Sequence, residues 1–232
     1  MQIRRNLLII VFFLCFQETQ ALDINITEKE IEGSLRMGHN KSFNFHHDIS
    51  ATALVELNGQ YALKGGFSTG NLDRAAAIKA FTGLQFFPLK EKRLFNISTI
   101  FIYNGLPNYE THSFTILPFV SVSGKIAGIS LGPSLCFTSF FGEKAQFESI
   151  LSFSAYVNFI NREKFRIGVT LSNFNEFEAE KFGAFRLALT SAYRINKQWG
   201  IFNDLEFMQR GIDGLSAVFF GFAWRGGAKF SW

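Results

Sequence analysis

The sequence predicts an all-β fold: a transmembrane, antiparallel, up-and-down β-barrel of about twelve strands, with ten or fourteen as alternatives. The first observation behind this is period-two alternation, because every even position from Val218 to Trp232 is apolar, counting glycine, as in a strand with one apolar face. Second, such segments recur along the chain, close to the roughly 9–11 residues that a tilted membrane strand needs. Third, no long apolar run follows residue 16, and in lipid only helices and closed barrels satisfy all backbone polar groups.

Twelve alternating segments follow one another from residue 31 onwards. They cover residues 31–38, 49–57, 61–67, 76–86, 94–103, 113–122, 127–137, 147–159, 165–171, 185–195, 199–207 and 218–232. The Asn58-Gly59 pair between the second and third segments is the strongest short signal for a hairpin. Pro118 and Pro133 cannot donate a ladder hydrogen bond, so they indicate bulges or a different strand count in this part of the chain.

The connections between these segments alternate in predicted length. Those after the second, sixth, eighth and tenth segments are short, and the one after the fourth is slightly longer. The other connections are generally longer and more polar: residues 39–48, 68–74, 104–112, 139–146, 172–184 and 209–215. Short turns at one end and longer loops at the other are typical of an outer-membrane barrel whose termini both lie on the periplasmic, short-turn side.

The N-terminal residues have the pattern of a cleaved signal peptide. Arg4 and Arg5 precede an apolar stretch over residues 7–16, and a small-x-small cleavage site ends at Ala21. The apolar stretch is too short to span a membrane. We therefore expect a signal peptide over residues 1–21 followed by one barrel domain over residues 22–232. The alternative is a lipoprotein signal with Cys15 as the lipidated residue.

The last strand of the chain contains Phe230 and ends on Trp232. It resembles the C-terminal strand of bacterial outer-membrane β-barrel proteins, in which a terminal aromatic residue acts as a signal for the barrel-insertion machinery. The resemblance implies a protein in the outer membrane of a bacterium with a double-membrane envelope. It also implies two partners: the outer-membrane lipid, and the insertion machinery through Phe230 and Trp232.

The composition supports an ordered membrane barrel. The chain contains 30 phenylalanines, only four prolines and 18% charged residues, which argues against disorder. The mature chain keeps one cysteine, Cys136, so an internal disulfide is not possible. The net charge of +4 is spread along the chain without a basic block, which argues against nucleic acid as a partner.

The second face of the predicted strands is polar and often charged. We expect the apolar face to meet lipid, since an Arg or Lys near the bilayer midplane costs about 2–4 kcal/mol there. The polar face would then line an aqueous lumen, with the candidate lining residues Lys64, Lys79, Glu148, Arg166, Arg186, Arg194, Asp204, Glu206 and Arg225. A soluble barrel or sandwich with the apolar face inside is the alternative that alternation by itself does not exclude.

The inward charges near the end of the chain have two interpretations. The segment that carries Asp204 and Glu206 lies between two segments that carry arginines, so both acids can pair with arginines on either side. The charges form either a narrow eyelet that selects solutes by a transverse field or a salt-bridge network that fills a closed lumen. About twelve strands fits both, because eight-stranded barrels are filled by side chains and much larger ones leave a channel.

Two histidine-containing groups are candidates for chemistry. His39, His46, His47 and Asp48 lie in or beside the first predicted loop, where a polar surface loop is a simpler interpretation than a transition-metal site. His112 and Ser113 cannot form a catalytic dyad, because adjacent residues of a strand point to opposite faces. We therefore expect no metal ion, no cofactor and no catalytic residues.

These observations favour a monomeric barrel that acts as a narrow, weakly selective channel for small solutes. The alternative is a non-conducting surface barrel, an adhesin or structural envelope protein, whose loops at 39–48, 104–112 and 172–184 bind partners. In the last of these loops, Glu176, Glu178 and Glu180 alternate with phenylalanines, which indicates a solvated loop at the membrane rim. An outer-membrane lipid hydrolase is the third possibility.

Overall fold

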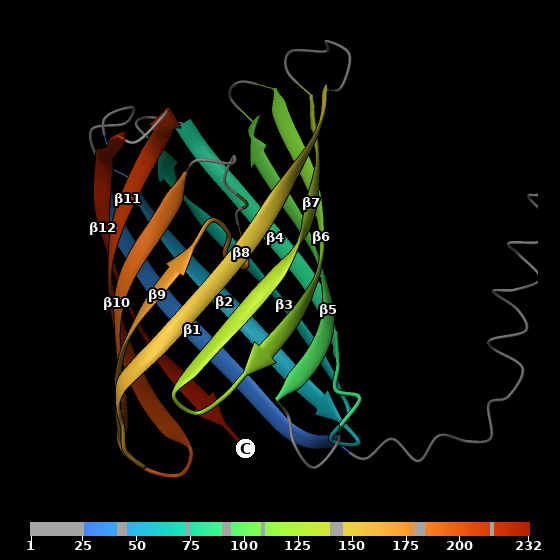
Figure 1. Ribbon diagram of the computed structural model, residues 1–232, viewed down its shortest axis with the longest axis vertical. Helices are drawn as coiled ribbons and strands as arrows, with labels where there is room; N and C mark the ends of the chain where they lie inside the picture. The colour runs from blue at the N-terminus through green and yellow to red at the C-terminus, as the bar shows by residue number, and fades with distance from the viewer. Residues whose placement is uncertain are drawn as a thin grey trace, which may run out of the picture.

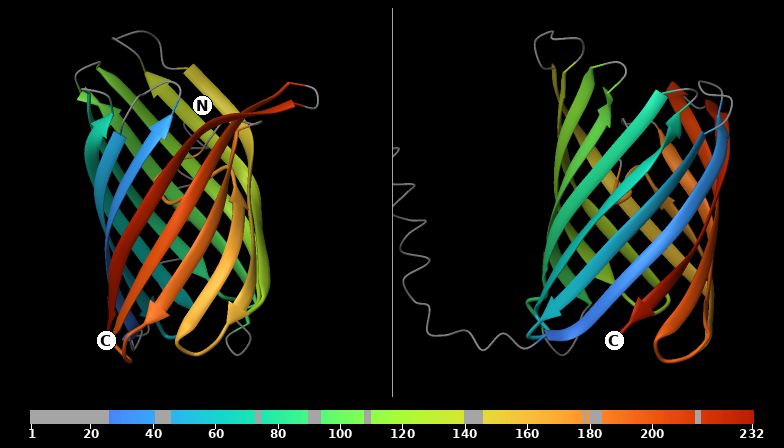
Figure 2. Two further views of the ribbon diagram at one scale, coloured as in Figure 1. Left: turned by 90° about the vertical axis from the view of Figure 1, so that its left-hand side faces the viewer. Right: turned by 180° about the vertical axis from the view of Figure 1, so that it is seen from behind.

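A computed structural model describes residues 26–40, 46–72, 75–89, 94–107, 110–139, 146–177, 179, 184–213 and 216–232. Within these ranges the strands are β1 (Ile26–Asn40), β2 (His46–Leu57), β3 (Tyr61–Leu72), β4 (Ala75–Phe86), β5 (Phe95–Leu106), β6 (Thr111–Ser123), β7 (Ala127–Ser139), β8 (Gln146–Asn161), β9 (Phe165–Ser172), β10 (Phe185–Arg194), β11 (Trp199–Asp213) and β12 (Ser216–Ser231). They form one closed barrel in which each strand pairs with its neighbours in sequence and β1 closes against β12 (Figures 1 and 2).

All pairings in this barrel are antiparallel. The predicted fold class and strand number are therefore confirmed, and each predicted segment overlaps one observed strand. Asn58 and Gly59 both have positive φ, 54° and 64°, as the predicted tight hairpin turn requires. The predicted signal peptide over residues 1–21 lies outside the described residues.

Several strands extend further than predicted at the end of the barrel away from the C-terminus. His46, His47 and Asp48 belong to β2 rather than to a loop, and β11 continues to Asp213. The prediction of loops over residues 68–74 and 209–215 is therefore wrong for 68–72 and 209–213, which belong to β3 and β11. The physical reason is that ladder hydrogen bonds continue wherever the backbone can pair, even where the apolar alternation has ended.

The apolar faces of the strands lie on the outside of the barrel. Ile49, Phe67 and Phe159 are 60%, 60% and 66% exposed, whereas inward serines such as Ser98 and Ser152 are buried. This is the orientation expected of a barrel in lipid, and it is the reverse of the soluble alternative. None of the described residues forms a helix that is long and apolar enough to cross a membrane.

Asn203, a polar residue in the middle of the outer face of β11, has a partner on the neighbouring strand. The Trp224 indole Nε1 donates a hydrogen bond to the Asn203 side-chain oxygen. An indole N–H in an apolar setting otherwise has no acceptor. Asn203 therefore satisfies a polar group of the outer surface and does not mark an inward turn of the strand.

The two strand prolines face each other across the β6–β7 pair. Ile116 pairs with Leu135 and Val120 with Leu131, so the register is the same on both sides of the gap in the ladder. The prediction of a bulge at Pro118 and Pro133 is therefore wrong, because the missing proline donors interrupt the ladder without inserting a residue.

Gly132, next to Pro133, allows the backbones of β6 and β7 to approach closely. A Cβ atom at this position would lie 2.0 Å from the Pro118 carbonyl oxygen, which is a backbone atom that cannot rotate away. We expect Gly132→Ala to lower the free energy of unfolding by about 1–3 kcal/mol, measured by urea unfolding in lipid vesicles with tryptophan fluorescence. Gly33→Ala is the matched control, because its added Cβ would meet nothing within 4 Å. Equal stability of the two variants would contradict this close approach.

Candidate functional site in the barrel interior

A cavity of about 400 Å³ lies inside the barrel, lined by residues from all twelve strands and from the β9–β10 connection. Five of the nine predicted lining residues contribute to it: Lys79, Arg186, Asp204, Glu206 and Arg225. Their strands place them there because alternate residues face inward. The structure therefore brings the central charges of β4, β10, β11 and β12 together around one space.

Arg36 of β1 forms the main ion pair of this cavity. Its Nε and Nη2 atoms donate hydrogen bonds of 3.1 and 2.7 Å to Glu206 Oε2. Both residues are 8% exposed, and the pair reaches across β12, which lies between β1 and β11. Arg36 also lies 3.8 Å from Asp48, which in turn lies 4.0 Å from Lys79. These ion pairs therefore form a chain of charges along the inner wall, which runs from β11 past the β12–β1 closure to β4.

Arg36 and Asp48 were not among the predicted site residues. Asp48 was assigned to a loop, and Arg36 lies far from Glu206 in sequence. The inward position of Arg36 in the alternation of β1 is the signal that could have identified it.

Arg225 of β12 forms a second group of ion pairs, also where β12 closes the barrel against β1. Its Nη2 donates a 2.5 Å hydrogen bond to Glu32 Oε1, and its Nη1 lies 3.8 Å from Asp204 Oδ2. The guanidinium also lies over the Phe202 ring, 5.0 Å from its centroid. The wall formed by β11, β12, β1 and β2 therefore carries charges of both signs, and its two arginines, Arg36 and Arg225, are paired with its carboxylates.

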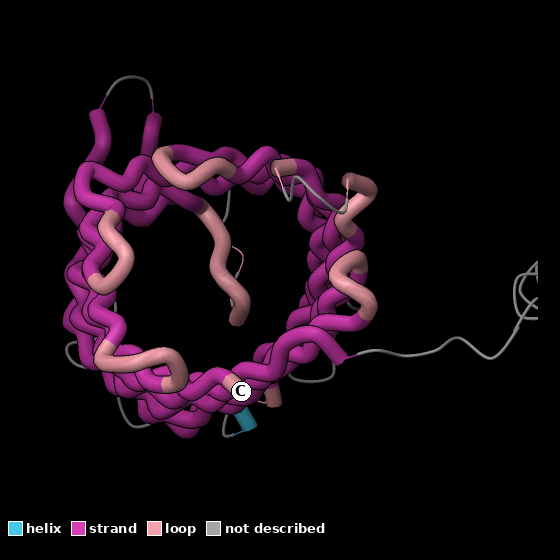
Figure 3. The backbone as a smooth tube through the Cα atoms, turned by 90° about the horizontal axis from the view of Figure 1, so that it is seen from below, coloured by secondary structure: helices cyan, strands magenta, loops and turns pink. Residues whose placement is uncertain are grey.

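The wall formed by β4, β5 and β6 carries an apolar patch on its inner surface, and the β9–β10 connection packs against this patch. Phe81, Ile102, Leu117 and Phe119 are buried there. Phe174 packs on Phe119, with ring centroids 5.5 Å apart, and Phe177 meets Phe81 edge-on at 4.9 Å. Figure 3, viewed along the barrel, shows a loop segment inside the ring of strands. We call residues 173–177 the inward segment.

Polar contacts also hold the inward segment. Asn173 is 1% exposed; its side chain donates a 2.8 Å hydrogen bond to the Leu151 carbonyl and accepts one of 2.7 Å from the Phe153 N–H. Glu176 forms an ion pair with Lys64 of β3. The expectation of a solvated rim loop is therefore wrong for this part of 172–184, because the apolar patch inside the barrel is covered by folding the phenylalanines inward.

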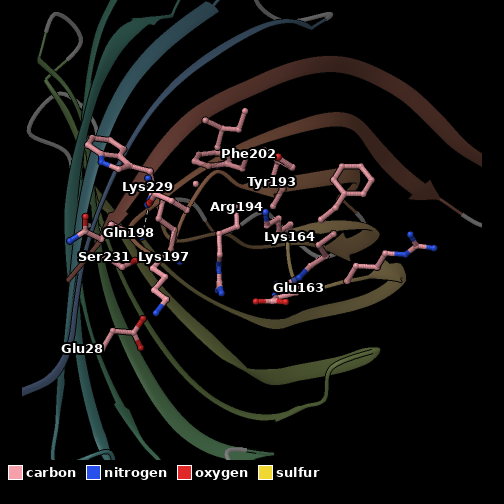
Figure 4. Close-up of a pocket in the computed structure, with 18 residues that line it drawn as sticks. Glu28, Glu163, Lys164, Tyr193, Arg194, Lys197, Gln198, Phe202, Lys229 and Ser231 are labelled. Atoms are coloured by element: carbon pink, nitrogen blue, oxygen red, sulfur yellow. Dashed lines mark hydrogen bonds between the residues drawn. The ribbon is translucent and has the colours of Figure 1, made fainter.

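Two of the other predicted lining residues, Arg166 and Arg194, lie at the short-turn mouth of the barrel. Cavities of about 410 and 550 Å³ adjoin each other there, and both residues line both cavities. Figure 4 shows Arg194 among the labelled side chains of the first cavity, with Glu163, Lys164 and Lys197 nearby. Glu148, the ninth predicted residue, is exposed near the start of β8 and lines none of these three cavities.

The histidines of the described strands lie apart from these cavities. His112 Nδ1 lies 2.9 Å from the Tyr103 hydroxyl, and the two rings stack. His46 is buried against Gly38, and His39 stacks on Phe222. In the part of the chain that the structure describes, no group of three or more His, Cys, Asp or Glu side chains is arranged to hold a metal ion.

Comparison with known proteins identifies similar folds but no sequence family. No protein-family model matches the chain, and no curated protein sequence matches it either. Among solved structures, a KdgM porin in complex with disordered oligogalacturonate has a TM-score of 0.58 at 9% identity, covering 88% of this chain and 99% of that one. The NanC porin has a TM-score of 0.57 at 10% identity, with coverages of 85% and 98%. The translocator domain of the autotransporter NalP from Neisseria meningitidis has 0.54 at 11%, with coverages of 95% and 94%. The chain therefore has the fold of bacterial outer-membrane β-barrels.

Proposed function

We propose that this chain is an outer-membrane channel for small solutes. The observation that carries the proposal is the reversed polarity of the barrel: the outside is apolar, whereas the inside holds a charged central cavity and two further cavities at one mouth. A polar inner wall allows water to fill the lumen, and the interiors of water-filled membrane barrels are polar in the same way. Two of the proteins with this fold are porins, which supports the same function.

The inner surface also explains why we propose a narrow and weakly selective pathway. The inward segment occupies part of the cross-section, and Arg36 and Arg225 of the central cavity are paired with carboxylates. Paired charges nearly cancel at a distance, so the centre excludes large solutes more strongly than it selects ions of one sign. The nine predicted lining residues belong to this proposal as the polar lining of the path.

Single-channel recording tests the function. Residues 22–232, refolded into a planar bilayer, should give discrete and reproducible conductance steps. Ala188→Trp fills the central cavity that Ala188 lines and should reduce the step. Ala53→Trp makes the same change at an exposed position of β2 and should leave it unchanged. A folded and inserted barrel that conducts no current would reject the channel.

Export and assembly complete the proposal. We infer that residues 1–21 are removed as a signal peptide, that the barrel resides in the outer membrane as a monomer, and that the insertion machinery binds β12 through Phe230 and Trp232. Phe230 packs between Trp199 and Trp232, with centroids 4.8 and 5.3 Å away. Such an aromatic group at the short-turn end suits the membrane interface. The adhesin alternative is less favoured, because part of loop 172–184 packs inside the barrel.

A further inference from the structure

Seven basic residues line the two cavities at the short-turn end of the barrel, and one of them, Lys229, forms an ion pair with Glu30. We call the other six the basic mouth: Lys125, Arg162, Lys164, Arg166, Arg194 and Lys197. They come from the turns after β6, β8 and β10 and from the adjoining ends of β9 and β10. The acids that line the same cavities are Glu28 and Glu163, so positive charge is in clear excess.

The basic mouth differs from the centre of the barrel in how its charges are compensated. In the centre, Arg36, Arg225 and Lys64 each form an ion pair with a carboxylate. Within the described residues, no ion pair joins any of the six mouth cations to a carboxylate. Neighbouring like charges without protein partners attract mobile anions from solution.

Two cations of the mouth face the lumen, and hydrogen bonds hold the backbone of the turns that carry the others. Arg166 and Arg194 share the 550 Å³ cavity with Thr170 and Thr190, which also line the central cavity. The Lys125 turn is fixed because the side chains of Asn158 and Asn161 donate hydrogen bonds of 2.9 and 2.8 Å to its carbonyl oxygen. A pre-positioned cation set binds an anion at a lower entropic cost than a mobile one.

We propose that the basic mouth is a binding site for small soluble organic anions that carry carboxylate or phosphate groups. The proposal rests on the channel function and names the solute class that the pathway favours. A volume of about 550 Å³ lies within the range of small-molecule sites and far exceeds that of a single inorganic ion. The threonine hydroxyls and the Tyr156 ring that line it suit a ligand with hydroxyl groups beside its charges.

Ion selectivity is the first test of the basic mouth. Under a KCl gradient, the reversal potential of the wild-type channel should show preference for chloride over potassium. Arg166→Glu combined with Arg194→Glu should reduce this permeability ratio by at least about threefold at 0.1 M salt and by less at 1 M, because added salt screens the charges. Liposome swelling should likewise favour gluconate over glucose, which has a similar size, and the double variant should remove this preference.

Lys29→Glu is the matched control, because Lys29 lies near the same end but over the Trp232 ring, outside both cavities. This variant should keep the wild-type selectivity. If it shifted the reversal potential as strongly as the double variant, lipid headgroups at the outer rim would be the anions concerned and the proposal would be overturned. A conducting wild type without anion preference would overturn the basic mouth and leave the channel in place.

Binding can be measured independently of conduction by calorimetry with pyrophosphate on the refolded protein in detergent. Saturable heat that disappears in the Arg166→Glu, Arg194→Glu variant and persists in Lys29→Glu would support the site even in a barrel that conducts no current. The absence of saturable binding to the wild type would overturn it. The channel and the anion site can therefore fail separately.

Discussion

Replacing Arg36 with methionine should lower the free energy of unfolding of the barrel by about 3 kcal/mol. The substitution keeps an unbranched apolar stem of similar length to that of arginine but removes the guanidinium group that donates two hydrogen bonds to the buried Glu206 carboxylate. Breaking a buried ion pair from one side costs about 3–5 kcal/mol. We expect the lower end of this range, because the pair lines a cavity that water can enter. Urea unfolding in lipid vesicles measures the change.

A double-mutant cycle separates the pair from the loss of packing. Glu206→Gln in the Arg36→Met background should recover a large part of the lost stability, since the amide does not leave a buried charge behind. Lys229→Met is the matched control: it breaks the ion pair with Glu30, in which the lysine side chain is 45% exposed. An exposed pair contributes about 0–1 kcal/mol. If Arg36→Met were no more destabilising than Lys229→Met, the pair would not stabilise the closure of β1 against β12.

Replacing both Phe174 and Phe177 with alanine should release the inward segment and raise the single-channel conductance. The two rings pack on Phe119 and Phe81 of the inner wall. Removing a buried phenylalanine costs about 3–5 kcal/mol, and 1.4 kcal/mol is tenfold in an equilibrium. Loss of about 3 kcal/mol from the packed state would therefore shift the ratio of packed to released segment by roughly a hundredfold. Larger steps or added open-channel noise in planar bilayers would show the release.

Phe67→Ala is the matched control for this variant, because Phe67 is 60% exposed on the outside of β3. It removes one aromatic ring from the barrel without touching the interior, so its conductance should equal that of the wild type. Lys64→Gln provides an intermediate test, since it removes the ion pair with Glu176 but leaves the aromatic contacts. An unchanged conductance in the double phenylalanine variant would show that the inward segment does not narrow the pathway.

Most of the fold was predictable because its signal is local. An outward residue meets lipid wherever it lies in the wall, so apolar alternation repeats in every strand and predicts the strand number. The strand ends were less predictable, as His46 and Asp213 show, since ladder hydrogen bonding continues where alternation stops. The effect of Pro118 and Pro133 was also mispredicted, because their opposition across β6 and β7 depends on a register that neither strand contains alone.

By itself, the sequence determined the barrel, its orientation with the apolar face outward, and the inward position of charges such as Arg186 and Arg225, because each depends on alternation within one strand. Only the tertiary structure decided which charges meet. Arg36 pairs with Glu206, 170 residues away in sequence, because ring closure makes the first strand a neighbour of the last. It also decided that Phe174 and Glu176 lie inside the barrel, because Phe174 packs on Phe119 and Glu176 pairs with Lys64, and both partners lie on strands that are distant in sequence.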